Sequence, residues 1–478
     1  MLSIITQNLD RYLVDANSHR ILEASLTAAV KRTVNEPELR SEIGHSHVFW
    51  RLTCLALTAL FFDRNAEQSL IALLKLARNV TAGDQMSQQL AIIQGALVEV
   101  ENIIRYRNRS SPVLSMTVIQ VGVQAICNFI TGNPIALESI WEDWMKQQDR
   151  GTVFSDLLAV NDDIVVMSTM VLILNCISNS SERCKIMIKS IPGQKMVEAI
   201  LDDLERLHND EKSKNFELGY TILSQLIDEG HFAALYDCIK GSNGQMNSRQ
   251  TRLLKVFDSK VHRWEQQQQQ QQHGLPSFIH DVDLECVASL VNGFSQEAVQ
   301  AFHQAKSGDG KVEMDNVSEL YTGLVLVLQL SVSLLTMQDQ GHFRELLVEK
   351  DTMSNMTNLL RCCETMSQPG FNYLKRDSVR LMGTLCYHDR RMQDKIRETG
   401  GIPLVLAQCK IDDANPYLRE HAVLAIRHML QDNNENQTLI AEMEPLQAVQ
   451  TDDLSDMGLT ARLENGKVKL SKKKSSDD

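Results

Sequence analysis

The sequence predicts an all-α protein of the armadillo-like α-solenoid class, a right-handed superhelix of three-helix repeats. Three observations favour this class. Glycine and proline are scarce, at 23 and nine of 478 residues, well below the roughly 12% of an average protein, so the chain lacks the turn punctuation that many short strands need. Similar segments recur at spacings of 44 to 49 residues. Each of them carries an apolar stripe that it cannot bury without neighbouring segments.

The clearest recurrence joins two segments of the C-terminal half. Arg380–Leu385 superposes on Leu424–Met429 at an offset of 44 residues, within the armadillo and HEAT range of roughly 40–47 residues. In the N-terminal half, Ala125–Phe129 superposes on Leu172–Cys176 at an offset of 47 residues, and a weaker copy is Leu76–Val80. Recurrence in register over several copies predicts stacked repeats.

One unit divides into three predicted helices. Gln393–Glu398 is the first, and Thr399-Gly400-Gly401 ends it, because glycine accepts the left-handed backbone of a helix C-cap. Ile402-Pro403 opens the second helix, since proline is tolerated in a first turn. Asn415-Pro416 begins the third, whose apolar side chains recur at steps of three and four: Leu418, Ala422, Ala425, Ile426 and Met429.

Breaks between the periodic segments divide the chain into four regions. Residues 1–240 are expected to hold N-terminal armadillo-like repeats, and residues 241–280 a helix followed by a linker with seven glutamines, Gln266–Gln272. The glutamine run is interpreted as an expanded loop or a frayed helix end. Residues 281–446 are expected to hold C-terminal repeats, and residues 447–478 a solvated, lysine-rich tail, with nuclear localisation as its alternative role.

Composition and motif content disfavour several classes of protein. With 48 Lys and Arg against 61 Asp and Glu, the net charge is −13, so the chain lacks the basic field that nucleic-acid binding uses. The ten cysteines include no C-x-x-C pair, and most lie in apolar stretches, which predicts reduced structural thiols and neither metal nor cofactor. Because no catalytic motif occurs and Tyr387-His388-Asp389 is interpreted as a solvated turn, we predict no catalytic residues.

Three uncharged stretches, residues 110–137, 164–181 and 320–338, are long enough to nominate membrane spans. Polar residues interrupt each of them, and a helix that is apolar nearly all round is also typical of the inner helix of a layered helical protein. We therefore expect buried helices and no membrane insertion. The N-terminus has no signal-peptide core, so the expected compartment is the cytoplasm.

Three segments within residues 371–446 are distinctive: LMGTLCYHDRRMQDKI, GGIPLVLAQCKIDDANPYL and AIRHMLQDNNENQTLIAEME. Their order, spacing and helix breaks resemble the C-terminal domain of the ataxin-10 family, in particular its fungal-type members. Weaker similarity extends upstream through LARNVTAGDQMSQQL and MVLILNCISNSSE. The glutamine run belongs to this sequence rather than to the shared pattern.

The resemblance implies a cytoplasmic, armadillo-like scaffold that binds other proteins and has no known catalytic activity. It further implies links to cytokinesis and cell division, to stimulation of intracellular protein O-glycosylation, to G-protein beta subunits and to self-association as a homo-oligomer. The resulting expectation is a scaffold that regulates cytokinesis. The alternative is a regulatory partner of an intracellular glycosyltransferase or of G-protein signalling.

An armadillo-type scaffold predicts a peptide-binding groove. In such proteins the third helix of each repeat lines the groove, and its asparagine can hydrogen-bond to the backbone of a bound peptide. The predicted groove residues of this chain are Asn79, Asn128, Asn175, Arg380, Thr384 and His428. An equally weighted alternative is that these polar side chains tie loops or helix ends together within each repeat.

A nuclear-import adaptor of the same architecture is a third functional class. Such adaptors carry a tryptophan four residues before the asparagine, and its ring packs against a bound Lys or Arg. The corresponding positions here hold no tryptophan: Lys75, Gln124, Val171, Arg380 and Leu424. This class is therefore disfavoured, although the net acidity would still attract basic peptides.

Overall fold

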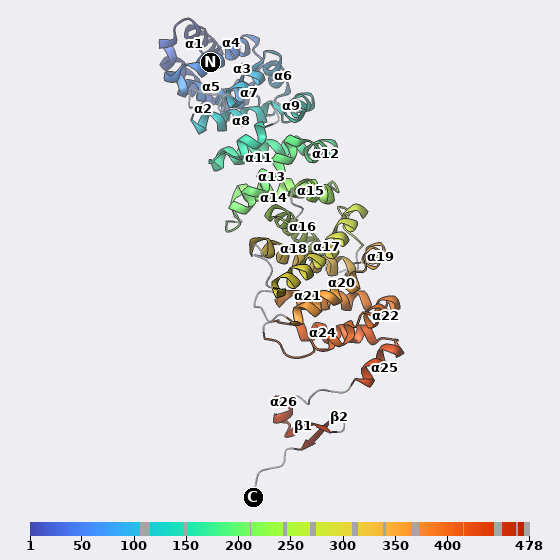
Figure 1. Cartoon of the computed structure of the whole chain (residues 1–478). Helices are drawn as coiled ribbons and strands as arrows, with labels where there is room; N and C mark the ends of the chain where they lie inside the picture. Colours follow the sequence, from blue (N-terminus) through green and yellow to red (C-terminus); the bar gives the residue numbers. More distant parts are fainter. Residues whose placement is uncertain are drawn as a thin grey trace. The chain divides into compact units, whose positions relative to one another are not determined.

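The computed structural model describes most of the chain, namely residues 1–105, 115–146, 152–210, 212–241, 246–267, 274–307, 314–337, 341–365, 372–413, 415–443, 452–464 and 467–472. Within these residues the chain forms 26 α-helices and one pair of strands (Figure 1). The predicted all-α, armadillo-like class is thereby confirmed. Two compact units result: unit 1 comprises residues 1–267 and 276–283, and unit 2 comprises residues 268–275 and 284–478.

Unit 1 contains sixteen complete α-helices and two short 3-10 turns, Ala16–Ser18 and Arg64–Ala66. The helices are α1 Leu2–Val14, α2 His19–Asn35, α3 Pro37–Gly44, α4 His47–Phe62, α5 Glu67–Val80, α6 Gln85–Ile93, α7 Ala96–Arg105, α8 Met116–Ile130, α9 Pro134–Lys146, α10 Val153–Leu158, α11 Asp163–Ile177, α12 Ser181–Lys189, α13 Ile191–Arg206, α14 Lys214–Asp228, α15 Phe232–Cys238 and α16 Ser248–Gln267. Helices α2, α5, α8, α11 and α14 pack against one another in that order.

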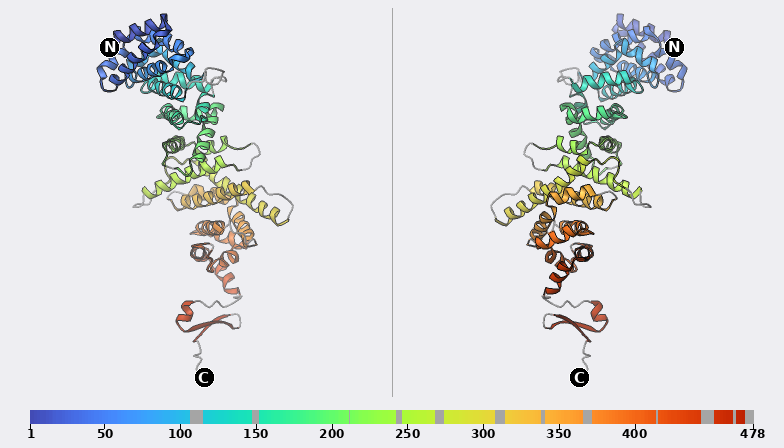
Figure 2. Two further views of the ribbon diagram at one scale, coloured as in Figure 1. Left: turned by 90° about the vertical axis from the view of Figure 1, so that its left-hand side faces the viewer. Right: turned by 90° about the vertical axis from the view of Figure 1, so that its right-hand side faces the viewer.

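Unit 2 contains the remaining helices and both strands. They are α17 Asp281–Ser307, whose first three residues belong to unit 1, α18 Met314–Thr336, α19 Gly341–Glu349, α20 Thr352–Thr365, α21 Asn372–Cys386, α22 Arg390–Glu398, α23 Gly401–Leu406, α24 Leu418–Leu430, α25 Asn434–Glu442, α26 Asp452–Asp456, β1 Leu459–Glu464 and β2 Lys467–Lys472. Helices α18, α21 and α24 pack successively, and Figure 2 shows α21 and α24 as neighbouring layers.

The same turn follows α5, α8, α11, α21 and α24. One residue in each turn has a left-handed backbone, with φ between 52° and 77°: Gly83, Gly132, Asn179, His388 and Asp432. In each turn the next residue accepts a hydrogen bond from a first-turn amide of the following helix: Asp84, Asn133, Ser180, Asp389 and Asn433. The side-chain cap replaces the missing helical partners of these amides. These five turns therefore share one local structure, a left-handed residue followed by a side-chain helix cap.

The unit that the sequence divides most clearly also has the expected helices. Helix α22 ends at Glu398, and Gly400 has the left-handed backbone, with φ of 71°, that the C-cap needs. Helix α24 begins at Leu418, two residues after Pro416. Its predicted stripe is buried at Leu418, Ala422, Ala425 and Met429, whereas Ile426 is only half-buried.

Helix α18 contains a window, Ser318–Thr336, that is long and apolar enough to cross a membrane by length and composition, and 56% of this window is buried inside the protein. Leu324, Val327 and Leu328 on this helix are fully buried. The other two uncharged stretches contain the shorter apolar helices α8 and α11.

The C-terminal region differs from the solvated tail that the sequence analysis expects. Helix α26 precedes an antiparallel hairpin (Figure 2). In its ladder Ala461 pairs with Leu470 and Leu463 pairs with Val468. The tail interpretation gave weight to the lysines and overlooked the period-two alternation of apolar residues in both strands, which is the ordinary strand signal. Residues 268–273 of the glutamine region and the final residues 473–478 lie outside the described part of the chain.

Candidate protein-binding grooves

Two of the predicted groove asparagines connect successive helices of unit 1. Asn79 on α5 donates from Nδ2 to Thr33 Oγ1 on α2, at 3.2 Å. Asn128 on α8 donates from Nδ2 to the carbonyl oxygen of Arg78 on α5, at 2.9 Å. Both asparagines are half-buried. The repeat of this bond along the stack indicates a structural role for the amide group.

The same position repeats the connection further along the chain. Asn175 on α11 donates from Nδ2 to Thr131 Oγ1, just beyond the end of α8, at 3.1 Å. In unit 2, His428 on α24 places Nδ1 3.0 Å from the carbonyl oxygen of Gly383 on α21. The ties thus run between successive repeats, whereas the sequence alternative places them within each repeat. Binding of a partner by these residues stays a prediction.

Three of the six predicted residues line one groove of unit 2, which we call the unit-2 groove. Arg380, Thr384 and His428 lie with Tyr387 and Leu424 around a cavity of about 590 Å³, to which α18, α19, α21 and α24 contribute. The other three predicted residues, all asparagines, lie in unit 1. The six residues therefore do not form one site within either unit.

Close helix packing shapes the unit-2 groove. A Cβ atom at Gly383 would lie 2.7 Å from the Cβ of Ala425, so the absence of a side chain lets α21 and α24 approach closely. The ring of Tyr387 lies with its centroid 4.8 Å from that of His428. Tyr387 is 49% exposed and Leu424 is 47% exposed, so the groove offers apolar surface to a ligand.

The polar groups of the unit-2 groove have two different roles. Arg344 donates to the carbonyl oxygens of Leu385, at 2.7 Å, and Thr384, at 3.3 Å, and burial lowers the pKa of its guanidinium. Arg344 therefore has a structural role. Arg380 is exposed. Burial of His421, together with the positive charge of Arg380, lowers the pKa of His421, and the imidazole ring is therefore neutral at pH 7. The groove thus combines one accessible cation with aromatic and aliphatic surface.

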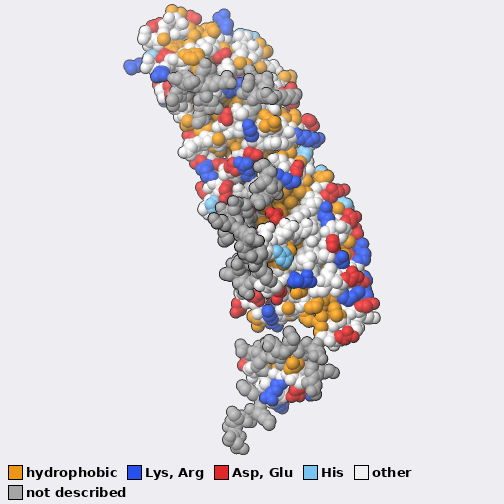
Figure 3. Space-filling view, in the orientation of Figure 1, with side chains coloured by type: hydrophobic (Ala, Val, Ile, Leu, Met, Phe, Trp, Pro, Cys, Tyr) orange, Lys and Arg blue, Asp and Glu red, His pale blue; other side chains and the backbone are white. Residues whose placement is uncertain are grey.

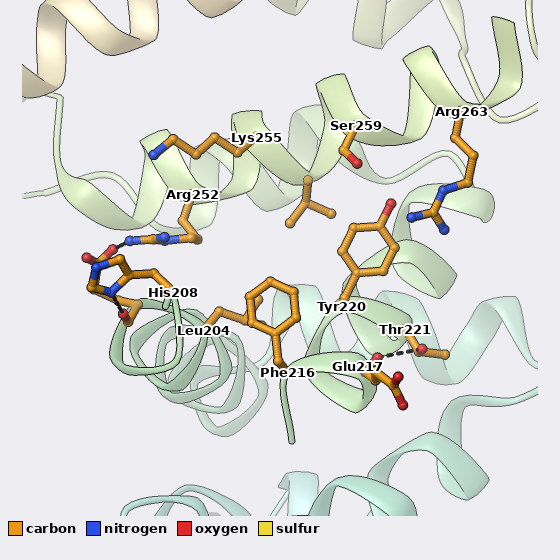
Figure 4. A pocket seen from close by; sticks show the side chains of 12 residues that line it. Leu204, His208, Phe216, Glu217, Tyr220, Thr221, Arg252, Lys255, Ser259 and Arg263 are labelled. Carbon is orange, nitrogen blue, oxygen red and sulfur yellow. Dashed lines mark hydrogen bonds and ion pairs between the residues drawn. The ribbon is translucent and has the colours of Figure 1, made fainter. Parts of the chain in front are cut away.

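A second groove lies in unit 1 between α13, α14 and α16, and we call it the unit-1 groove (Figure 4). Its cavity measures about 870 Å³. The guanidinium carbon of Arg263 lies 5.2 Å from the ring centroid of Tyr220, within the range of a cation–π contact. Arg252 pairs with Glu205 at the other end, and Lys255 lies between the two arginines on α16.

The sequence analysis did not predict the unit-1 groove, because the repeat register fades in this region. A signal was nevertheless present on α16. Its apolar face carries Leu253, Phe257 and Val261, which are buried. Arg252, Lys255, Ser259 and Arg263 recur at steps of three and four on another face, all of them in the groove lining.

No group of three or more His, Cys, Asp or Glu in the described part of the chain is placed to hold a metal ion. On the face in Figure 3, acidic and basic side chains are interspersed rather than gathered by sign. The described cysteines form no disulfide bonds, and burial raises the pKa of Cys54 to about 11 and that of Cys363 to about 12.

Comparison with known proteins identifies relatives of the C-terminal region. Residues 374–471 match the family model described as the spinocerebellar ataxia type 10 protein domain. The ataxin-10 homolog of Dictyostelium discoideum is 40% identical over 116 residues, which cover 22% of this chain and 19% of that protein. Ataxin-10 of Bos taurus is 37% identical over 122 residues, 24% of this chain and 26% of that protein. The ataxin-10 homolog of Candida albicans is 34% identical over 103 residues, 22% of each.

The chain therefore matches only about a fifth to a quarter of the length of these relatives. Among solved structures, one concerning the interaction between cadherin and beta-catenin is 12% identical, with 87% of this chain and 67% of that chain covered and a TM-score of 0.37. A designed armadillo repeat protein in complex with the peptide (KR)4 is 13% identical, with coverages of 78% and 98% and a TM-score of 0.22. These scores are too low to add to the fold class, which follows from the chain's own helices.

Proposed function

We propose that this chain, whose residues 374–471 match the spinocerebellar ataxia type 10 protein domain, is a non-enzymatic scaffold that binds partner polypeptides in its grooves. The observation that carries this proposal is the unit-2 groove, because Arg380, Thr384 and His428 all lie inside the matched segment. Binding residues on packed helices are held in place better than residues on loops, which favours a recognition surface here.

The groove chemistry suits a polypeptide with mixed character. The exposed side chains of Tyr387 and Leu424 can cover apolar residues of a partner, and Arg380 can donate to its carbonyl or carboxylate oxygens. Tyrosine and arginine are also the residue types that most often dominate binding energy at protein interfaces. The family resemblance supports a finer role in cytokinesis, a cytoplasmic location and self-association as parts of this proposal.

The test is affinity purification of the full chain, followed by mass spectrometry, with the double variant Arg380→Glu/Leu424→Asp. We expect this variant to lose at least one partner that the natural chain retains, because it reverses the charge and removes the apolar surface of the unit-2 groove. Its folding is checked by circular dichroism.

A matched control makes the same chemical changes on α4, outside both grooves. Arg51 and Leu55 are exposed there, Leu55 to 55%, so Arg51→Glu/Leu55→Asp should retain the partners. An identical set of partners for the natural chain and the folded groove variant would rule out this groove as the binding surface.

A further inference from the structure

Helix α24 is the last helix of the stack α18, α21 and α24 among the described residues, and it carries an apolar face whose counterparts on α8, α11 and α21 are buried. The reference positions are the predicted groove residues, Asn128 on α8 and Thr384 on α21. The side chains five before, two before and two after each of them are all 0% exposed: Val123, Ile126, Ile130, Val379, Met382 and Cys386. Helices α5 and α11 follow the same rule. This face meets the next helix of the stack, as the close approach of Gly383 to Ala425 shows.

Among the residues that the structure describes, no further repeat follows α24 to cover its equivalent face. Val423, the counterpart of Val379, is 54% exposed, and Ile426 and Leu430 are only half-buried. Helix α25 continues this surface. Its Ile440 is half-buried, whereas the counterpart Ile396 on α22 is 0% exposed. We call Val423, Ile426, Leu430 and Ile440 the terminal face.

The hairpin formed by β1 and β2 has an apolar face of its own. Leu463 pairs with Val468, and Ala461 pairs with Leu470. Directly paired residues of an antiparallel ladder project on the same side, so these four side chains share one face. Leu463, Val468 and Leu470 are 39%, 49% and 56% exposed. Helix α26 contacts β1, yet these three side chains remain exposed, and a two-stranded hairpin is only marginally stable in water without an apolar surface to pack on.

We propose that the apolar face of the hairpin docks on the terminal face of the same chain and closes the repeat stack. The ends of solenoids require caps that are apolar inside and polar outside. The hairpin has this character, because the pairs Arg462–Lys469 and Thr460–Ser471 occupy its opposite face. It is thus chemically suited to replace the repeat that α24 lacks.

The short segment that connects α25 to α26 favours docking of the chain's own hairpin over docking of a hairpin from another copy. Only residues 444–451 separate Met443 from Asp452, a distance of at most about 30 Å when extended. Helix α25, with nine residues, is about 13 Å long, so the hairpin can reach the whole terminal face. A short tether also gives an effective concentration on the order of millimolar.

Hydrogen exchange of the full chain, read by mass spectrometry, tests the docking. We expect Leu463→Ser/Leu470→Ser to increase the exchange rate of amides in α24 and α25 by about tenfold, since it removes apolar contacts that hold the cap in place. The matched control Arg462→Ser/Lys469→Ser changes the opposite face of the same strands and should leave these rates unchanged.

A reciprocal variant guards against simple unfolding of the hairpin. Val423→Asp alters only the terminal face, and it should increase exchange in β1 and β2. Unchanged exchange in α24 and α25 for the first variant, or in the strands for Val423→Asp, would refute the proposal. Light scattering after size exclusion supplies the remaining outcome: a dimer whose protection of α24 depends on protein concentration would assign the terminal face to a second copy and overturn docking within the chain.

Discussion

Asn128 lies half-buried on α8, where its amide group joins two stacked helices. Its spacing from Asn79 and Asn175 is visible in the sequence, but the partner of its Nδ2 group is not, because the carbonyl of Arg78 lies 50 residues away. The sequence could therefore locate the repeat position and could not decide whether its amide faces a ligand or the neighbouring repeat.

Asn128→Ala is expected to lower the free energy of unfolding by about 1–2 kcal/mol, because it leaves the half-buried carbonyl of Arg78 without this donor. Urea denaturation followed by circular dichroism measures the loss. Asn161→Ala, at an exposed position, serves as the control and should change stability by less than about 0.5 kcal/mol. Equal midpoints for the two variants would argue against a structural role for the amide of Asn128.

Asp258 on α16 is a second residue whose environment only the structure reveals. Burial raises its pKa from 3.8 to about 6, a shift that nearby Glu265 reinforces and nearby His262 opposes. A folded-state pKa above the unfolded value means that the folded state holds the proton more tightly. Stability therefore falls as pH rises from about 4 to about 6 and stays reduced above that range.

Asp258→Asn is consequently expected to stabilise the chain at pH 7.5 by about 1–2 kcal/mol, a value reduced from the full pKa shift to allow for partial solvent screening. The advantage should shrink toward zero near pH 3, where the natural carboxyl is largely protonated in both the folded and the unfolded state. Thermal unfolding at the two pH values tests this. Asp10→Asn, an exposed change on α1, should behave like the natural chain; an advantage of Asp258→Asn that is equal at both pH values would contradict the assignment.

At the scale of elements, a buried glutamine joins consecutive repeats in both units. Gln88 Nε2 lies within 3.2 Å of three carbonyl oxygens, those of Thr81, Asn128 and Thr131. Gln393 repeats the arrangement within 3.3 Å of the carbonyls of Cys386, His428 and Gln431. In each case one side chain satisfies carbonyls at the ends of two neighbouring helices, which otherwise lack partners.

Gln393→Ala is expected to cost about 2 kcal/mol and to increase hydrogen exchange at the C-terminal ends of α21 and α24, because their carbonyls lose a shared donor. Gln437 occupies the same repeat position at the end of the stack, where it is exposed and its side-chain Nε2 donates only to the carbonyl oxygen of Leu430, at 2.8 Å, among the described residues. Gln437→Ala should therefore have little effect. A cost for Gln437→Ala as large as that for Gln393→Ala would show that the bridge between repeats is not the stabilising feature.

At the scale of the whole molecule, the chain divides into two compact units. Every tryptophan of the chain lies in unit 1: Trp50, Trp141, Trp144 and Trp264. Tryptophan fluorescence consequently reports on unit 1, whereas circular dichroism at helical wavelengths reports on both units. The sequence therefore allows the stability of the units to be separated without added labels.

Leu385→Ala removes a fully buried side chain from unit 2 and is expected to cost about 3 kcal/mol there. In urea, the circular dichroism signal should gain a transition at lower denaturant, while the fluorescence midpoint stays where it is in the natural chain. The matching variant Leu223→Ala in unit 1 should move the fluorescence midpoint instead. A fluorescence midpoint that follows Leu385→Ala would mean that the units unfold as one.

The sequence by itself determined the all-α class, the repeat spacing and the positions of the repeated turns. These properties are local: the period of apolar residues, the glycine or asparagine of a turn and the cap that follows it all act within a few residues. The hairpin of β1 and β2 could also be predicted, since the strands alternate and Asn465-Gly466 between them is a hairpin signal.

Only the tertiary structure decided which polar side chains the stack uses and which remain available to a partner. The bonds of Asn128, Gln393 and His428 span 35 to 50 residues, and their geometry depends on how far each helix is rotated against the next. A rotation of one residue position would exchange a groove side chain for a buried one, and the periodicity of a sequence does not fix that angle.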